Sequence, residues 1–163
     1  MSEQLLGVMV GAGWCVQGGP TEAETVPAGV KIRTPEYLQL VQDAYLPAML
    51  ERQVTCFIQD GAPSHTSKIA LAGLRDILGG ASIQLLQQLP PSPDLNVLDF
   101  SIWAQIQHQV GATRTVAEAK AKINAAIHSL QAQSAEHNMC IVNNFIRRLK
   151  RCISAEGGAF SMD

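Results

Sequence analysis

Val-Thr-Cys-Phe-Ile-Gln-Asp-Gly-Ala-Pro-Ser-His, residues 54–65, opens the most informative part of the sequence, and Pro-Pro-Ser-Pro-Asp-Leu-Asn-Val-Leu-Asp, residues 90–99, closes it. Each end places a carboxylate at a junction between elements. Asp60 directly follows an apolar strand, and Asp99 falls in the first turn of an amphipathic helix. Carboxylates at the ends of separate elements can converge and hold a hard divalent cation. The stretch therefore predicts a metal site.

Taken singly, each acid has a simpler structural explanation. Asp60 precedes a glycine, and an Asp-Gly pair after a strand is typical of a tight turn. Asn96 can cap the helix that follows it, which puts Asp99 at the third helical position, where a carboxylate helps to satisfy exposed N–H groups. A functional interpretation therefore depends on the two acids acting as a pair.

The composition is that of an ordinary globular domain. The chain has 163 residues, 47% of them apolar and 16% charged, which is the size of about one domain. A net charge of −2 gives no general attraction to nucleic acid, so any such contact needs a local basic patch. No apolar run reaches membrane-spanning length, and we expect no membrane partner.

The four cysteines, at positions 15, 56, 140 and 152, form no Cys-x-x-Cys pair. The spacing predicts neither a disulfide framework nor a zinc site, and it favours a reducing intracellular compartment. Cys56 and Cys140 lie in apolar runs, where we expect small buried thiols.

Hydrophobic periodicity predicts strands at 5–10, 21–26, 54–58 and 83–89, and helices starting near Thr34, Ser64, Val97, Thr115 and Ser134. This order is typical of a mixed α/β layer in which helices pack on a sheet. We expect Pro47 to bend or end the first helix. Ile69, Leu74, Ile77 and Leu78 are predicted to form the inner face of helix 64–78, and Ile141, Val142, Phe145, Leu149 and Ile153 that of the last helix.

Together, Gln59 to His65 and Ser92 to Asp99 resemble two signature blocks of mariner-like transposases, which are cut-and-paste enzymes of the DDE/D class. The resemblance places the second catalytic carboxylate at Asp60 and the third at Asp99, with 38 residues between them. An aspartate at the third position resembles the mariner-type branch. Residues 8–12 look like the family's second core strand, and residues 145–158 like its C-terminal ending.

The resemblance implies a ribonuclease-H-like fold, in which a mixed sheet is flanked by helices. Residues 1–112 would form an incomplete DDE/D catalytic core, and residues 113–163 a C-terminal helical part of the same domain. It also implies two Mg²⁺ or Mn²⁺ ions that support in-line phosphoryl transfer on DNA, and a nuclear location.

The class uses three catalytic acids, and the chain departs from that pattern. The first acid belongs to a strand that precedes residues 5–10, and the chain starts too late to contain it; the family's helix-turn-helix region is absent as well. Among local acids, Glu3, Glu22, Glu24 and Asp43 are unconvincing replacements. Loss of a central strand would leave unpaired edges inside the sheet. We expect the chain alone to be inactive, and to need a homodimer partner or another chain that supplies the missing strand.

Several other side chains could contact nucleic acid: His65, Lys68, Arg147, Arg148 and Arg151. For His65, hydrogen bonding near the turn after Asp60 is the simpler role. For the arginines, a solvated helix face is at least as well supported, since cations are favourable near a helix C-terminus. Phe100 and Trp103 could stack on bases, although their spacing favours core packing. The alternative function is a non-catalytic nucleic-acid-binding or protein-interaction module that retains the fold.

Overall fold

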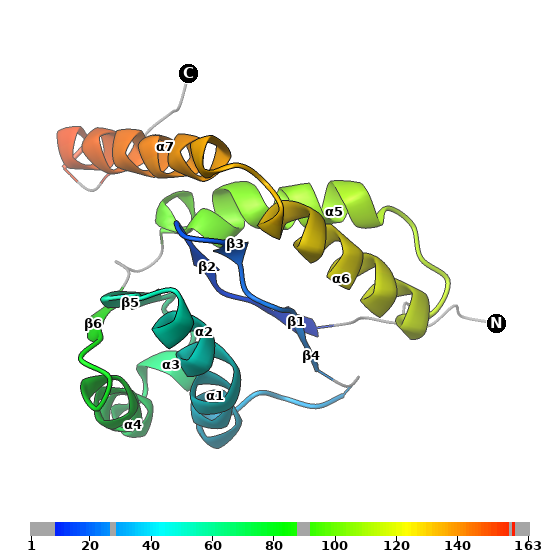
Figure 1. Ribbon diagram of the computed structural model, residues 1–163. Helices are drawn as coiled ribbons and strands as arrows, with labels where there is room; N and C mark the ends of the chain where they lie inside the picture. The colour runs from blue at the N-terminus through cyan, green and yellow to red at the C-terminus, as the bar shows by residue number, and fades with distance from the viewer. Residues whose placement is uncertain (1–8, 27–28, 88–91, 157, 159–163) are drawn as a thin grey trace.

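The computed structural model describes residues 9–26, 29–87, 92–156 and 158. Figure 1 shows a mixed α/β fold in which short strands lie between two groups of helices, which confirms the expected fold class. The strands are β1 (Met9–Gly11), β2 (Trp14–Cys15), β3 (Gly19–Pro20), β4 (Glu24–Val26), β5 (Cys56–Gln59) and β6 (Gln84–Gln87). The helices are α1 (Thr34–Leu40), η1 (Val41–Tyr45), α2 (Leu46–Glu51), α3 (Pro63–Thr66), α4 (Lys68–Gly79), η2 (Pro93–Leu95), η3 (Leu98–Ile102), α5 (Trp103–Val110), α6 (Val116–Gln131) and α7 (Ala135–Ser154).

The first four strands make one antiparallel hairpin. Strand β1 pairs with β4, and β2 pairs with β3. Between the two ladders, Thr21 N–H donates to the Gly13 carbonyl at 2.9 Å, and Gly13 N–H donates to the Thr21 hydroxyl at 2.8 Å. The predicted strand at 21–26 is therefore confirmed in its second half, while residues 5–8 of the first predicted strand lie outside the described residues.

The hairpin turns at residues 16–18, and Gly19, the first residue of β3, is a position where a larger residue would be strained. Its φ of +69° is in the left-handed region, and a Cβ at this position would lie 3.2 Å from the Leu130 carbonyl oxygen of α6. The hairpin backbone therefore packs directly on the end of α6.

The remaining strands, β5 and β6, form a parallel pair that starts at the Cys56–Gln84 position and is connected through α3 and α4. Within the described part of the chain, no ladder joins this pair to the hairpin. The apolar core is divided in a similar way. One cluster gathers the hairpin, η3, α5, α6 and α7, and the other gathers α1, η1, α2, α4 and the β6 region.

The first helix does not end at Pro47 but continues to Glu51. Residues 41–45 widen into a π-helical turn, and α2 begins at Leu46 with Pro47 in its first turn. Proline lacks an N–H and crowds the carbonyl four residues earlier, so a wider preceding turn lets the helix continue. Thr34 is likewise the first helical residue and not the cap, and its hydroxyl donates to the Ser64 carbonyl at 3.3 Å.

The predicted helix 64–78 is split into α3 and α4 at Ser67, whose extended backbone lets its hydroxyl accept from Ala70 N–H at 3.1 Å. Leu74 and Leu78 are fully buried as expected, but Ile69 is 74% exposed. The prediction for Ile69 was wrong. The helix breaks at Ser67 and α4 begins at Lys68, so Ile69 lies in a new first turn, on the exposed side of the helix.

The last helix begins where Ser134 caps it, with His137 N–H donating to the hydroxyl at 3.2 Å. Ile141 is buried, which agrees with the predicted inner face, whereas Leu149 and Ile153 are exposed. Cys140 is exposed as well, so the expectation of a buried thiol there was wrong. All four cysteines are unpaired thiols, in agreement with the expected lack of a disulfide framework.

None of the helices within the described residues combines the length and apolarity needed to cross a membrane.

The two core clusters are joined by a few specific contacts. Arg52, at the end of α2, donates to the carbonyls of Gly19 at 2.9 Å and Pro20 at 3.2 Å.

Candidate metal and catalytic site

Asp60 is the first residue after β5. Its Oδ1 accepts from Ala62 N–H at 3.0 Å, which closes the tight turn expected from the Asp-Gly pair. The same oxygen lies 2.6 Å from Nδ1 of His65, so the imidazole donates when that nitrogen carries the proton. The side chain is about half exposed, and Oδ2 has no hydrogen-bond partner among the described residues. One oxygen is thus fixed by the protein, and the other is open for a ligand.

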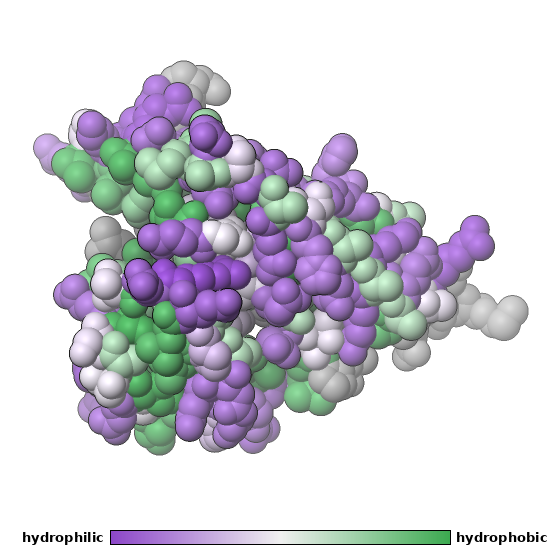
Figure 2. All heavy atoms as spheres, in the orientation of Figure 1, coloured by the Kyte–Doolittle hydropathy of each residue, from purple (hydrophilic) through white to green (hydrophobic). Residues whose placement is uncertain are grey.

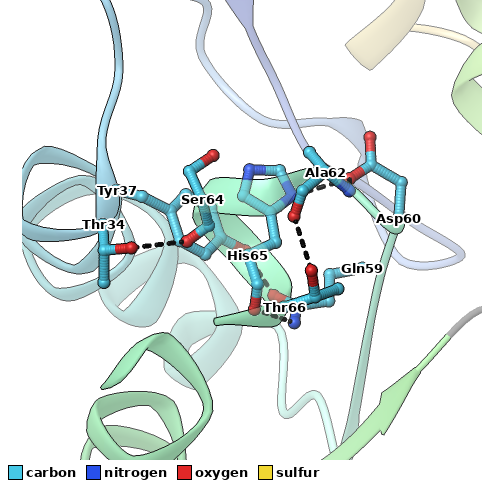
Figure 3. Close-up of polar contacts among 8 residues, drawn as sticks. All are labelled: Thr34, Tyr37, Gln59, Asp60, Ala62, Ser64, His65 and Thr66. Carbon is cyan, nitrogen blue, oxygen red and sulfur yellow. Dashed lines mark hydrogen bonds and ion pairs between the residues drawn. The ribbon is translucent and has the colours of Figure 1, made fainter. Parts of the chain in front are cut away.

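His65 is itself held in place by the residues around it (Figure 3). Its ring stacks on Tyr37 of α1, with centroids 3.8 Å apart and an interplanar angle of 26°. The Tyr37 hydroxyl donates to Gln59 Oε1 at 2.7 Å, and Gln59 Nε2 donates to the His65 carbonyl at 2.9 Å. These contacts connect α1, β5 and α3, and they fix the imidazole against Asp60.

Tyr37 and Gln59 support the site, and neither was expected to do so from the sequence. Gln59 is buried although it is polar and ends an apolar strand. A buried glutamine needs hydrogen-bond partners. A glutamine at the end of an apolar strand, directly before Asp60, could therefore have indicated a supporting role.

The hydrogen bond from His65 lowers the pKa of Asp60, partial burial opposes this, and the Ala62 N–H lowers the pKa further. The carboxylate is therefore ionised at neutral pH. Burial raises the pKa of the Tyr37 hydroxyl, and the neighbouring Tyr45 and Asp60 add to the shift. Tyr37 therefore stays protonated and can donate to Gln59.

Asp99 lies in the π-helical turn η3, just inside the start of the third predicted helix. Asn96 caps this helix as expected, because its Oδ1 accepts from Leu98 N–H at 3.0 Å. The turn is wide enough for Trp103 N–H to reach the Leu98 carbonyl. Single π-turns inside helices are frequent at functional sites, since they displace one residue from regular helical spacing.

The charge of Asp60 is one of the influences on the Asp99 carboxyl. The pKa of Asp99 is raised first by partial burial and second by the negative charge of Asp60, while its Asn96 contact lowers it. Two neighbouring carboxylates repel each other, and a divalent cation between them would relieve that repulsion. The open Oδ2 of Asp60 and the carboxylate oxygens of Asp99 are the kind of ligand that a hard cation prefers. Within the described residues there is no cluster of three or more His, Cys, Asp or Glu side chains, so the site supplies two acids.

The basic residues proposed for nucleic-acid contact differ in their surroundings. Lys68 is exposed at the first turn of α4, and Arg147 is exposed on α7. Arg148 is only 14% exposed: its guanidinium lies 3.2 Å from Asp94 Oδ1 and 4.4 Å from the centroid of the Phe100 ring. Arg151 is partly buried. Arg148 therefore holds α7 against η2 and η3, whereas Lys68 and Arg147 are available at the surface.

The aromatic residues of the third helix pack inward. Phe100 and Trp103 both contact the cluster built around Ile102, Ile106 and Ile127, as their spacing predicted. Base stacking by these two rings is not supported.

The described residues form a mixed α/β domain that carries Asp60 directly after β5 and Asp99 in η3. Its fold is the ribonuclease-H-like fold of mariner transposase catalytic domains. The Mos1 mariner transposase catalytic domain superposes with a TM-score of 0.77 over 94% of this chain and 76% of that one, at 20% identity. The Mos1 catalytic domain with raltegravir and Mg gives 0.76 at 21% identity, covering 94% and 77%. The Mos1 paired-end complex with Mn gives 0.77 at 20% identity, covering 94% of this chain and 45% of that one. No family model and no curated protein sequence matches the chain.

Proposed function

We propose that the chain is part of a mariner-like transposase catalytic domain, in which Asp60 and Asp99 bind the divalent cation used for phosphoryl transfer on DNA. The observation that carries the proposal is the match of the fold to the Mos1 catalytic domain over 94% of the chain. The two acids come from two separate signature blocks, and the charge of Asp60 contributes to the raised pKa of Asp99.

The residues present fit Mg²⁺ or Mn²⁺, the ions named in the Mos1 structures. Such an ion would activate the attacking oxygen and stabilise the leaving one. The chain's own residues prepare the site. His65 and the Ala62 N–H fix one oxygen of Asp60, and Asn96 sets the start of the helix that carries Asp99.

We further propose that the 163-residue chain does not cleave DNA by itself, because it contributes two of the three acids that the class uses. Another segment or another chain would supply the remaining strand and acid. Apolar residues on the existing strands support this, since Met9 of β1 and Ile58 of β5 are both more than half exposed. DNA is the proposed partner, which implies a nuclear location.

The test is Mn²⁺ binding to the purified chain, measured by electron paramagnetic resonance. Asp60→Asn and Asp99→Asn should each abolish most of the binding. Asp76→Asn, which changes an exposed acid of α4, is the matched control and should leave binding intact. Equal binding by all four proteins would contradict the metal site. Robust Mg²⁺-dependent DNA cleavage by the chain, lost in Asp60→Ala, would contradict the proposed inactivity.

The second candidate is a non-catalytic nucleic-acid-binding module. The two-acid site and the exposed Lys68 and Arg147 favour it. DNA binding that is unchanged by metal chelation and by Asp60→Asn would support this module over the enzyme fragment.

A further inference from the structure

Helix α7 carries two different apolar stripes. The stripe facing the body contains Asn138, Ile141, Phe145, Arg148 and Cys152. Asn138 Nδ2 donates to the Val16 carbonyl at 3.1 Å, Ile141 is buried in the core, and Arg148 is held by Asp94 and Phe100. These contacts fix how the helix is rotated about its axis.

The second stripe, which we name the α7 seam, consists of Met139, Val142, Ile146, Leu149 and Ile153. Four of its members are exposed: Met139 by 46%, Ile146 by 42%, Leu149 by 37% and Ile153 by 69%. Figure 2 shows apolar surface over the C-terminal part of α7 at the upper left. At about 100° per residue, the α7 seam is rotated by roughly a quarter turn from the body-facing stripe. It is therefore a separate face of the helix.

The spacing of the α7 seam is that of a helix–helix interface. Its members follow one another at steps of three, four, three and four residues, which is the heptad pattern of a coiled-coil seam. The pattern covers two heptads, which is short for an isolated coiled coil. Because contacts with the body already hold α7 in helical form, association would not include the free-energy cost of forming the helix.

The charges beside the α7 seam indicate its partner. On the flank away from the body, the residues at heptad spacing are Glu136, Asn143 and Lys150, and all three are exposed. When two such helices run antiparallel, Glu136 of one faces Lys150 of the other at both ends, and the two Asn143 side chains meet in the middle. A parallel pair would instead set the basic halves around Arg147 and Lys150 side by side.

We propose that the α7 seam is a self-association surface, and that two copies of this chain pair through antiparallel α7 helices. The apolar seam provides the contact area, and the Glu136–Lys150 pairs set the direction. This surface is independent of the carboxylate site and of the unpaired strand edges.

The test is sedimentation equilibrium of the full chain over a concentration series. The wild type should be a dimer in exchange with monomer, and Ile146→Glu should weaken dimerisation by at least about tenfold. Ile69→Glu is the control, because Ile69 is an even more exposed isoleucine on α4. Circular dichroism confirms that each variant is folded. A wild type that stays monomeric at about 100 µM, or a dimer insensitive to Ile146→Glu, would overturn the proposal.

Charge reversal tests the direction. Glu136→Lys and Lys150→Glu should each weaken the dimer, and the double variant should recover most of the loss, since opposite charges then face each other again. If the double variant is as weak as or weaker than the single ones, antiparallel pairing is wrong.

Discussion

At the residue scale, the contact between Asp60 and His65 both positions the Asp60 carboxylate and lowers its pKa. The imidazole lies 2.6 Å from the carboxylate oxygen and is the largest cause of the lowered pKa of Asp60. Tyr37 stacking keeps the ring in place. The ring therefore acts on Asp60 as a positioning group.

Replacing His65 with Phe should keep the stack and remove the hydrogen bond, so the pKa of Asp60 should rise toward its ordinary value. A depressed folded-state pKa stabilises the fold at pH values above the unfolded pKa, and that stability is lost as pH falls through the folded pKa. His65→Phe should therefore lose less stability than the wild type on acidification below about pH 4. Carbon-13 NMR titration of the aspartate carboxyls measures the shift directly.

The control is His128→Phe, which removes an exposed histidine 3.4 Å from Glu22 and far along the chain from the site. It should leave the titration of Asp60 unchanged. An unaltered Asp60 titration in His65→Phe would show that the imidazole does not act on this carboxylate.

At the element scale, Arg148 and Arg147 are sequence neighbours with opposite roles. Arg148 is mostly buried between Asp94 and Phe100, and it joins α7 to η2 and η3. Arg147 is exposed. Arg148→Met should lower the free energy of unfolding by about 1–2 kcal/mol, since a partly buried ion pair and a cation–π contact are lost. Arg147→Met should cost less than about 0.5 kcal/mol.

Urea unfolding measures both variants, and a DNA-binding assay at two salt concentrations separates the roles. If Arg147 contacts phosphate, Arg147→Met should weaken binding and reduce its salt dependence. The assignment fails if Arg148→Met leaves the urea midpoint unchanged and weakens DNA binding instead.

Local sequence signals predicted the element starts well. Asn96, Thr115 and Ser134 all act as helix caps, because a cap depends on residues within a few positions. The two acids were proposed from their place at element ends together with the resemblance of the two blocks, and their role stays a prediction. Which apolar residues are buried was harder to predict. Ile69, Leu149 and Ile153 fit the helical period but are exposed, since periodicity does not say how many faces of a helix will be covered.

At the scale of the whole molecule, the divided sheet matches a divided core. The hairpin belongs to one apolar cluster, whereas β6 and the helices around it belong to the other. Arg52 connects the two through the Gly19 and Pro20 carbonyls. Tyr45 adds a second connection, since its hydroxyl lies 3.0 Å from where a Cβ on Gly11 would stand. A sheet continuous across the molecule would normally make such a unit cooperative.

We therefore predict that the two clusters open separately in native-state hydrogen exchange. Amides of α4 and α6, each within its own cluster, should show different opening free energies, and the strand edges at β1 and β5 should exchange fastest among the strands. Arg52→Met should widen the difference between α4 and α6, because it removes the guanidinium that joins the clusters. Arg75→Met, which changes an exposed arginine of α4, should leave the difference as it is. One shared opening free energy for both helices, unchanged in Arg52→Met, would mean that side-chain packing alone makes the divided sheet a single cooperative unit.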